Sequence, residues 1–180
     1  MPGSVFLENE HVSLRPAEPE DIDFIKSNEN NRDVRSSRSR VTPSGDDWAQ
    51  KHIGGTMGRN GDTVCLLVCV EEQPVGLVYL LREQPNDQQY NKGELAYWIT
   101  PKQWNNGYAT HTAELIIEYA FAELGLHRLT ATVFDTNMAS KRVLESVGFK
   151  EEGVLRKQVF TNGEWVDKIQ YGLLANEWSL

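Results

Sequence analysis

The chain has 180 residues, which fits one domain (residues 1–180) with a sizeable core. Its formal net charge of −8 repels phosphate backbones, so we expect no direct nucleic-acid ligand. Apolar runs such as 64–70 are far shorter than the roughly 18 residues that span a bilayer, and no charged-then-apolar leader is present, so we expect a cytoplasmic protein without membrane contact.

The first quarter of the chain predicts one strand and two helices. Residues 5–15 alternate between apolar and polar and predict a strand that Pro16 ends. The run Glu18-Pro19-Glu20-Asp21 then predicts a helix start, because proline is tolerated in the first turn and acidic groups stabilise the positive end of the helix dipole. A further short helix is expected from a Ser44 cap to about Met57.

Between these helices lies the polar and least periodic segment, residues 28–44. It carries arginines at positions 32, 35, 38 and 40. Two interpretations stay open: the arginines face an acidic or carboxylate-bearing substrate, or the segment is a solvated loop.

The middle of the chain predicts three antiparallel strands at residues 63–70, 75–82 and 92–99. Apolar residues at helical spacing between Ala109 and Leu124 predict a long amphipathic helix, which Gly125 ends. The alternation of Leu129, Ala131 and Val133 then predicts a strand, and the strand-helix-strand order makes it parallel to its predecessor.

The last third of the chain predicts a second helix and a hairpin. Asp135-Thr136-Asn137 opens the helix and Gly148 closes it. Asn162-Gly163 is a strong hairpin signal between two strands. Together the elements predict a mixed α/β sheet.

Cysteine and histidine placement gives no metal site. Cys65 and Cys69 are four apart on a predicted strand and share a face, but no second cysteine pair or spaced histidine pair accompanies them. We therefore interpret both as buried apolar residues. The four histidines are dispersed along the sequence: His11, His52, His111 and His127.

The junction between the third strand and the long helix predicts an anion site. Asn105, Asn106 and Gly107 cover the backbone little, so consecutive N–H groups at a helix N-terminus can point at a phosphate or pyrophosphate. The alternative is an ordinary strand-to-helix turn.

Three stretches carry a family resemblance, in the right order and at compatible spacing. They read G-E-L-A-Y-W-I-T-P-K-Q-W-N-N-G-Y-A-T (93–110), Y-A-F-A-E-L-G-L-H-R-L (119–129) and N-M-A-S-K-R-V-L-E-S-V-G-F-K-E-E-G (137–153). They resemble the GNAT superfamily of N-acetyltransferases, in the branch of the ribosomal-protein N-terminal acetyltransferases. The resemblance implies an α/β (α+β) GNAT fold: a mixed, mostly antiparallel sheet with a central parallel strand pair and about four flanking helices.

The resemblance also implies an acetyl-CoA site, with no metal. It places the pyrophosphate at the W-x-x-G-Y-A-T loop and the thioester carbonyl near the end of the central strand. It assigns Ser140 to the neighbourhood of the thioester sulfur. Two interpretations stay open for Lys141 and Arg142 beside the cofactor motif: they meet the nucleotide phosphate, or they are only solvated. The implied cofactor residues are Trp98, Ile99, Asn105, Asn106, Gly107, Tyr108, Ala109, Thr110, Asn137 and Arg142.

The acid–base residues depart from the usual family pattern. Leu144 stands where many members carry a tyrosine acid, and His111 stands where the branch usually shows glutamate. Residues 157–160 lack the carboxylate that some branch members place before the hairpin. Glu94 matches a general-base position, acting directly or through water; the alternative is a structural carboxylate. We therefore predict Glu94 and Ser140 as catalytic.

The expected function is acetyl transfer from acetyl-CoA to a primary amine in a ternary complex, foremost a protein N-terminus. The alternatives are a small amine, such as a polyamine, amino acid or antibiotic, and a non-catalytic acyl-CoA-binding module. The net acidity favours a cationic acceptor mildly, or it serves only solubility. The sequence is compatible with a homodimer without indicating one.

Overall fold

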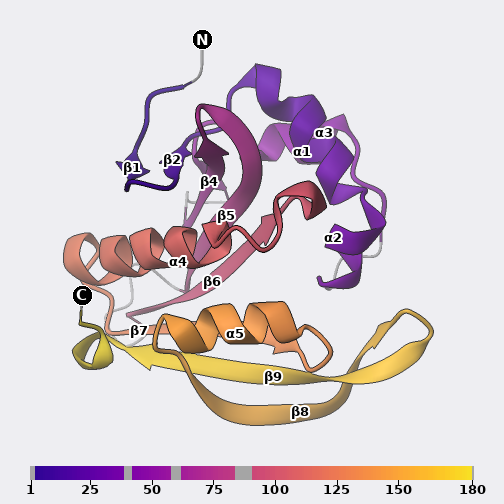
Figure 1. The fold of residues 1–180 in the computed structure, drawn as a ribbon, viewed down its shortest axis with the longest axis vertical. Helices are drawn as coiled ribbons and strands as arrows, with labels where there is room; N and C mark the ends of the chain where they lie inside the picture. The colour runs from indigo at the N-terminus through magenta and orange to yellow at the C-terminus, as the bar shows by residue number, and fades with distance from the viewer. Residues whose placement is uncertain (1–2, 39–41, 58–61, 84–90, 180) are drawn as a thin grey trace.

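The computed structural model describes residues 3–38, 42–57, 62–83 and 91–179. Its strands form one mixed sheet in the order β1-β2-β4-β5-β6-β7-β9-β8, with β3 paired to β4 (Figure 1). The strands are β1 (Leu7–Glu8), β2 (Ser13–Arg15), β3 (Thr56–Met57), β4 (Thr63–Val70), β5 (Gln73–Glu83), β6 (Lys92–Ile99), β7 (Arg128–Phe134), β8 (Lys150–Thr161) and β9 (Glu164–Leu174).

In the described residues, five α-helices and several shorter turns of helix connect these strands. The α-helices are α1 (Ile22–Glu29), α2 (Arg32–Ser36), α3 (Asp46–Ala49), α4 (Tyr108–Glu118) and α5 (Met138–Ser146). The 3₁₀ turns are η1 (Pro19–Asp21), η2 (Gln50–His52), η4 (Pro101–Gln103) and η6 (Ala175–Glu177), and the π-helical turn η5 spans Tyr119–Glu123. Within the described ranges, no helix is long and apolar enough to cross a membrane.

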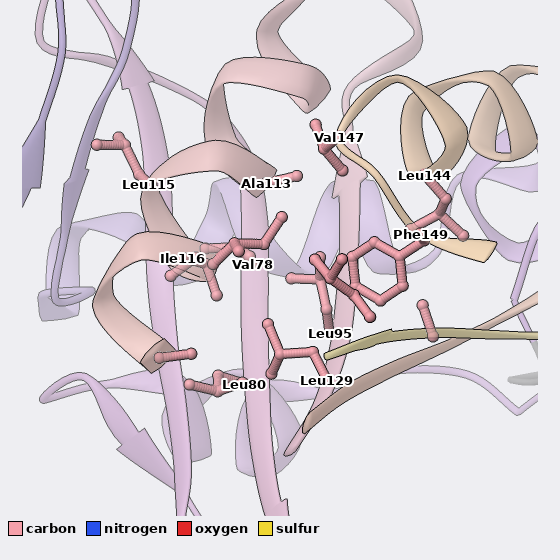
Figure 2. Packing of buried hydrophobic residues seen from close by; sticks show 14 of the residues in the cluster. Val78, Leu80, Leu95, Ala113, Leu115, Ile116, Leu129, Leu144, Val147 and Phe149 are labelled. Carbon is pink, nitrogen blue, oxygen red and sulfur yellow. The ribbon is translucent and has the colours of Figure 1, made fainter. Parts of the chain in front are cut away.

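Each face of the sheet has its own core, because side chains along a strand alternate between the faces. On one face α4 and α5 cover the larger cluster, in which Leu80, Leu95 and Leu129 from three strands meet Ile116 and Leu144 (Figure 2). On the other face α1, α2 and α3 cover a second cluster. Cys65 and Cys69 are free thiols buried in that second cluster, as predicted, and burial raises the pKa of both.

The sheet opens at the parallel pair of β6 and β7. β6 and β7 are in register over just three residue pairs, from Lys92↔Arg128 to Glu94↔Thr130. Beyond them, residues 95–99 of β6 have no strand partner on the β7 side, while β7 continues its pairing with β9. The facing backbone edges of 95–99 and 131–134 therefore border a gap in the sheet.

Most predicted elements are confirmed. The strand before the anion loop, the parallel crossover and the second helix lie where the sequence placed them. The long helix runs to its predicted end, but its last turn is π-helical before Gly125 at φ 63°. Asn162 (φ 51°) and Gly163 (φ 89°) form the turn between β8 and β9, since both central residues adopt the positive φ of a type I′ hairpin.

Two N-terminal predictions are wrong in detail. The single strand expected at residues 5–15 is a pair, β1 and β2, because the Asn9 side chain accepts hydrogen bonds from the backbone N–H groups of His11 (2.9 Å) and Val12 (3.0 Å) and turns the chain. The helix expected from a Ser44 cap to Met57 has Gly45 as its N-cap and ends at His52. Gly54 and Gly55 then adopt positive φ, and Met57 belongs to β3.

Candidate active site

A cavity of about 320 Å³ lies where β6 and β7 separate, with α2 on one side and α4 and α5 on the other. Five predicted site residues line it: Trp98, Ile99, Ala109, Asn137 and Ser140. The others lie outside its lining: Glu94, Asn105, Asn106, Gly107, Tyr108, Thr110 and Arg142.

The first turn of α4 presents backbone donors beside this cavity. Gly107 is the N-cap at φ 79°, and its carbonyl accepts the first intrahelical hydrogen bond, from His111 N–H (3.1 Å). The three amides of residues 108–110 precede that bond, and no side chain caps them. This end of α4 therefore fits an anionic group such as a pyrophosphate.

The loop before α4 is fixed to the end of β6. Trp104 Nε1 donates a 2.7 Å hydrogen bond to the Ile99 carbonyl, and the half-exposed indole lines the cavity. The Asn106 side chain donates to the carbonyls of Gln103 (3.1 Å) and Trp104 (3.3 Å), and Asn105 adopts a φ of 63°. Both asparagines thus shape the loop while their side chains stay out of the cavity lining.

The cavity holds a hydroxyl pair that the sequence analysis did not foresee. Tyr97 Oη on β6 lies 3.1 Å from Ser140 Oγ on α5. Burial raises the pKa of Tyr97 to about 12, although the Ser140 hydrogen bond acts in the opposite direction. The phenol therefore stays protonated at neutral pH. The sequence did carry one signal for Tyr97, because side chains alternate along β6 and this puts Tyr97 on the same face as Leu95 and Ile99.

α5 positions Ser140 through its own cap. The Asn137 side-chain oxygen accepts a 3.1 Å hydrogen bond from Ser140 N–H, as an N-cap residue does. Arg142 is exposed on the outer side of α5, and Lys141 beside it is partly buried. The structure thus brings Asn137 and Ser140 together and leaves Arg142 apart from the cavity lining.

Glu94 reaches the cavity only through a neighbour. Its Oε1 accepts a 3.2 Å hydrogen bond from Thr132 Oγ1, and Thr132 lines the cavity. Thr132 is a second residue that the sequence analysis missed, since nothing local to residue 132 indicates a partner 38 positions earlier.

On the other face, Glu29 is a fully buried carboxylate, and it organises the wall of the cavity. Its Oε1 accepts hydrogen bonds from Trp98 Nε1 (2.9 Å), Arg38 Nη1 (2.5 Å) and Tyr79 Oη (3.3 Å). Tyr79 Oη also lies 3.0 Å from His52 Nε2, and burial lowers the pKa of His52. Charge-assisted bonds of this kind offset the cost of burying the carboxylate. Glu29 had been placed in a polar segment, so sequence reasoning missed it.

His111, which replaces the glutamate usual in the family branch, makes two contacts in the structure. The ring of His111 stacks on His11, with centroids 3.9 Å apart, and its Nδ1 lies 3.2 Å from Glu114 Oε2. These two histidines, dispersed in sequence, thus meet in the fold, where they join the β1–β2 turn to α4. Across the described ranges, no group of three or more potential ligand side chains could hold a metal ion.

Comparison with known proteins decides the family. Residues 11–150 match the model of the acetyltransferase (GNAT) domain. The chain belongs to the GNAT family of acetyltransferases.

Its relatives in the GNAT family include proteins whose names give different substrates. A putative ribosomal N-acetyltransferase, YdaF of Bacillus subtilis, is 30% identical over 94% of both chains. Spermidine N(1)-acetyltransferase of Escherichia coli K12 is 26% identical over 93% of this chain and 88% of its own. The uncharacterized N-acetyltransferases YoaA and YnaD of B. subtilis are 39% and 37% identical, but the chain spans only about half the length of each.

Solved structures agree on the GNAT fold. The spermidine N-acetyltransferase of Vibrio cholerae, in complex with CoA and spermine, superposes with a TM-score of 0.82 at 25% identity, covering 94% of this chain and 98% of that one. Acetyltransferases of the GNAT family use acetyl-CoA as the acetyl donor.

Proposed function

We propose that this chain is an acetyl-CoA-dependent N-acetyltransferase whose acceptor is an α-amine, foremost a protein N-terminus. The observation that carries the proposal is the uncapped start of α4 beside a cavity at the opening between β6 and β7. An anion site and an unpaired strand edge are what a coenzyme with a pyrophosphate and an amide-bearing arm requires.

On the donor side, the amides of residues 108–110 hold the pyrophosphate, and the loop of Asn105, Asn106 and Gly107 lets it approach. The pantetheine arm lies along the open β6 edge at Trp98 and Ile99, which places the thioester near Ser140. At the rim of this site, Arg142 binds the nucleotide phosphate.

In the reaction the amine nitrogen attacks the thioester carbonyl carbon, the C–S bond breaks and the sulfur leaves as a thiolate. Ser140, hydrogen-bonded to Tyr97, is the proton donor for that sulfur. The proton lost by the amine passes to Glu94 through Thr132, whose hydroxyl connects the cavity to the carboxylate. A backbone N–H at the end of β6 stabilises the oxyanion.

The sparse acid–base equipment favours an α-amine over a lysine side chain. A terminal amine of pKa ~8 is about one-tenth free base at pH 7, whereas a lysine amine of ~10.4 is free to only about 0.04%. That difference amounts to about 3 kcal/mol of barrier. The similarity to the putative ribosomal acetyltransferase supports the same choice.

A polyamine is the second candidate acceptor, because the similarity to spermidine acetyltransferases covers almost the whole chain. The proposal is tested by following free thiol while the protein is incubated with acetyl-CoA and each acceptor. Release with Ser- or Ala-initiated peptides supports an N-terminal acetyltransferase, and release with spermidine alone supports the polyamine enzyme. Tight CoA binding without release from any amine overturns catalysis and leaves a binding module.

A further inference from the structure

The charged side chains that line the cavity have one sign. They are Arg38, which follows α2, and Lys168 of β9. No carboxylate belongs to the lining within the described part of the chain. The cavity is therefore locally basic although the whole chain carries a net charge of −8.

Both cations lie on the face of the sheet that α1, α2 and α3 cover. Ile169 belongs to the core beneath α4 and α5, so its neighbour Lys168 points to the opposite face. Arg38 lies over the ring of Tyr79, 5.5 Å from its centroid, in the cluster of that opposite face. Lys168 and Arg38 are thus separated by the sheet from the helix start that we assign to the pyrophosphate.

The two cations differ in how their charges are balanced. Arg38 is paired with Glu29, so it contributes little net charge. Lys168 forms no ion pair with any described carboxylate. The residues opposite it on the two neighbouring strands are apolar: Phe134 on β7 and Leu155 on β8. Asp167, adjacent in sequence, pairs with Lys157 instead.

Glu94, on the same face, is held by Thr132 and does not line the cavity. α2 and the β8–β9 hairpin lie side by side (Figure 1), joined by a hydrogen bond from Thr161 Oγ1 to the Ser36 carbonyl (3.3 Å). The elements that carry Arg38 and Lys168 therefore form one wall.

We propose that the acceptor carries a carboxylate near its reacting amine and that Lys168, with Arg38 beside it, binds this carboxylate. The inference rests on the proposed acetyltransferase function. An anionic group would supply the counter-ion that Lys168 lacks, and a charge-assisted hydrogen bond in a partly buried site is stronger than a neutral one. A polycation would instead bring ammonium groups beside Lys168 with no carboxylate in the lining to receive them.

The test uses acceptors that differ in a single charge. Three amidated pentapeptides share the sequence Ser-X-Gly-Ala-Tyr, with Asp, Asn or Lys at X, and free serine is compared with serinamide. Thiol release gives KM and kcat, and calorimetry on the CoA-saturated protein gives peptide affinity whether or not turnover occurs. We expect one of two results: the KM of the Asp peptide is about tenfold below that of the Asn peptide, or the KM of serine is about tenfold below that of serinamide. The first result assigns the bound carboxylate to a side chain and the second to the α-carboxylate.

Variants separate charge recognition from a general loss of structure. Lys168→Gln removes the preference for the acidic acceptor by raising the KM of the Asp peptide to that of the Asn peptide, and Lys168→Glu shifts the preference to the Lys peptide. Lys150→Gln is the matched control, because Lys150 pairs with Glu177 away from the cavity; it keeps the wild-type preference.

Equal KM values for acidic and neutral acceptors, or a preference for the Lys peptide or spermidine, overturn the inference. An acid preference in binding without thiol release sustains the carboxylate site and refutes the proposed catalysis instead.

Discussion

At the residue scale, the groups that we propose to react come in pairs drawn from different elements. Ser140 is set by the cap of α5 and meets Tyr97 from β6, and Glu94 of β6 meets Thr132 of β7. Each pair joins two sides of the opening in the sheet. The proposed proton transfer therefore depends on the same geometry that forms the cavity.

The pair of Glu94 and Thr132 predicts a pH-dependent defect. Glu94→Gln removes the proton acceptor, so we expect kcat/KM at pH 7 to fall about 100-fold, within the range for a general base. Raising the pH deprotonates the amine in solution, so the deficit shrinks as pH rises. Rates measured from pH 6.5 to 9.5 check this, and Thr132→Val should reproduce the effect. A deficit that is constant with pH would mean that Glu94 is only structural.

The partly buried phenol of Tyr97 predicts a loss of stability in alkali. Its pKa is raised to about 12 from an ordinary value near 10. Below pH ~10 both the folded and the unfolded chain keep this proton, so the free energy of unfolding is not reduced by Tyr97. As the pH rises to ~12, the unfolded chain loses the proton first, and the free energy of unfolding falls by on the order of 2 kcal/mol.

Urea unfolding at pH 8, 10 and 11 measures that loss. Tyr97→Phe should show a shallower decline than the wild type over the same interval, because the phenylalanine ring does not titrate. Parallel curves for the two proteins would contradict the assignment.

Gly107 predicts a selective loss of coenzyme affinity. Alanine at φ 79° costs about 1–2 kcal/mol of stability, and alanine at Gly125, the other end of the same helical segment at φ 63°, costs a similar amount. Only at Gly107 does the added methyl group enter the proposed phosphate site, so Gly107→Ala should weaken CoA binding about tenfold or more while Gly125→Ala leaves it unchanged. Calorimetric titration distinguishes them; equal affinities would remove the phosphate site from this loop.

At the element scale, β5 and β6 come unusually close beside the cavity. A Cβ at Gly76 would lie 2.3 Å from the Trp98 carbonyl oxygen and 2.7 Å from Ile99 Cδ1. Glycine at this position therefore lets the end of β6 keep its place next to the proposed path of the coenzyme arm.

Gly76→Ala should consequently displace the end of β6. We expect a loss of about 3 kcal/mol in the free energy of unfolding, at the upper end for overpacking, together with a raised KM for acetyl-CoA. Gly153→Ala is the control, since nothing lies within 4 Å of its added methyl group. Chemical denaturation and steady-state kinetics on both variants give the answer, and a Gly76→Ala chain as stable as the control would contradict the clash.

Sequence reasoning succeeded where local signals decide the structure. Gly125, Gly148 and the Asn162-Gly163 turn marked ends correctly because positive φ is a property of single residues. Near residue 9 it failed because a side-chain hydrogen bond turned one expected strand into two.

For the site, the predictable part was the backbone loop at Gly107, whose composition alone indicates bare amides. Tyr97, Thr132 and Glu29 were missed because their roles depend on partners 38 to 69 positions away. Contacts at that separation leave no mark on local composition.

At the scale of the whole molecule, three parallel residue pairs join the β1–β6 part of the sheet to the β7–β9 part. The buried cluster beneath α4 and α5 continues across the junction (Figure 2). A ligand seated in the opening touches both parts, so its binding should stabilise the entire fold.

Thermal unfolding with and without CoA tests this coupling. At a CoA concentration about 100 times Kd, the stabilisation is about 2.7 kcal/mol, which raises Tm by about 5–10 °C in a domain of this size. Hydrogen exchange should slow at both 95–99 and 131–134. Protection confined to one of these segments would place the ligand elsewhere. The Gly107→Ala variant, measured at the same CoA concentration, provides the control.

The open edge of β6 has a consequence for handling the protein. Unpaired strand edges capture other extended chains, and most proteins shield them with charge, proline or a covering loop. Here the edge at 95–99 has no strand partner toward β7 among the described residues, and it is recessed between two layers of helices. Ligand-free preparations should therefore be the ones that precipitate on concentration, and storage with CoA should keep them clear.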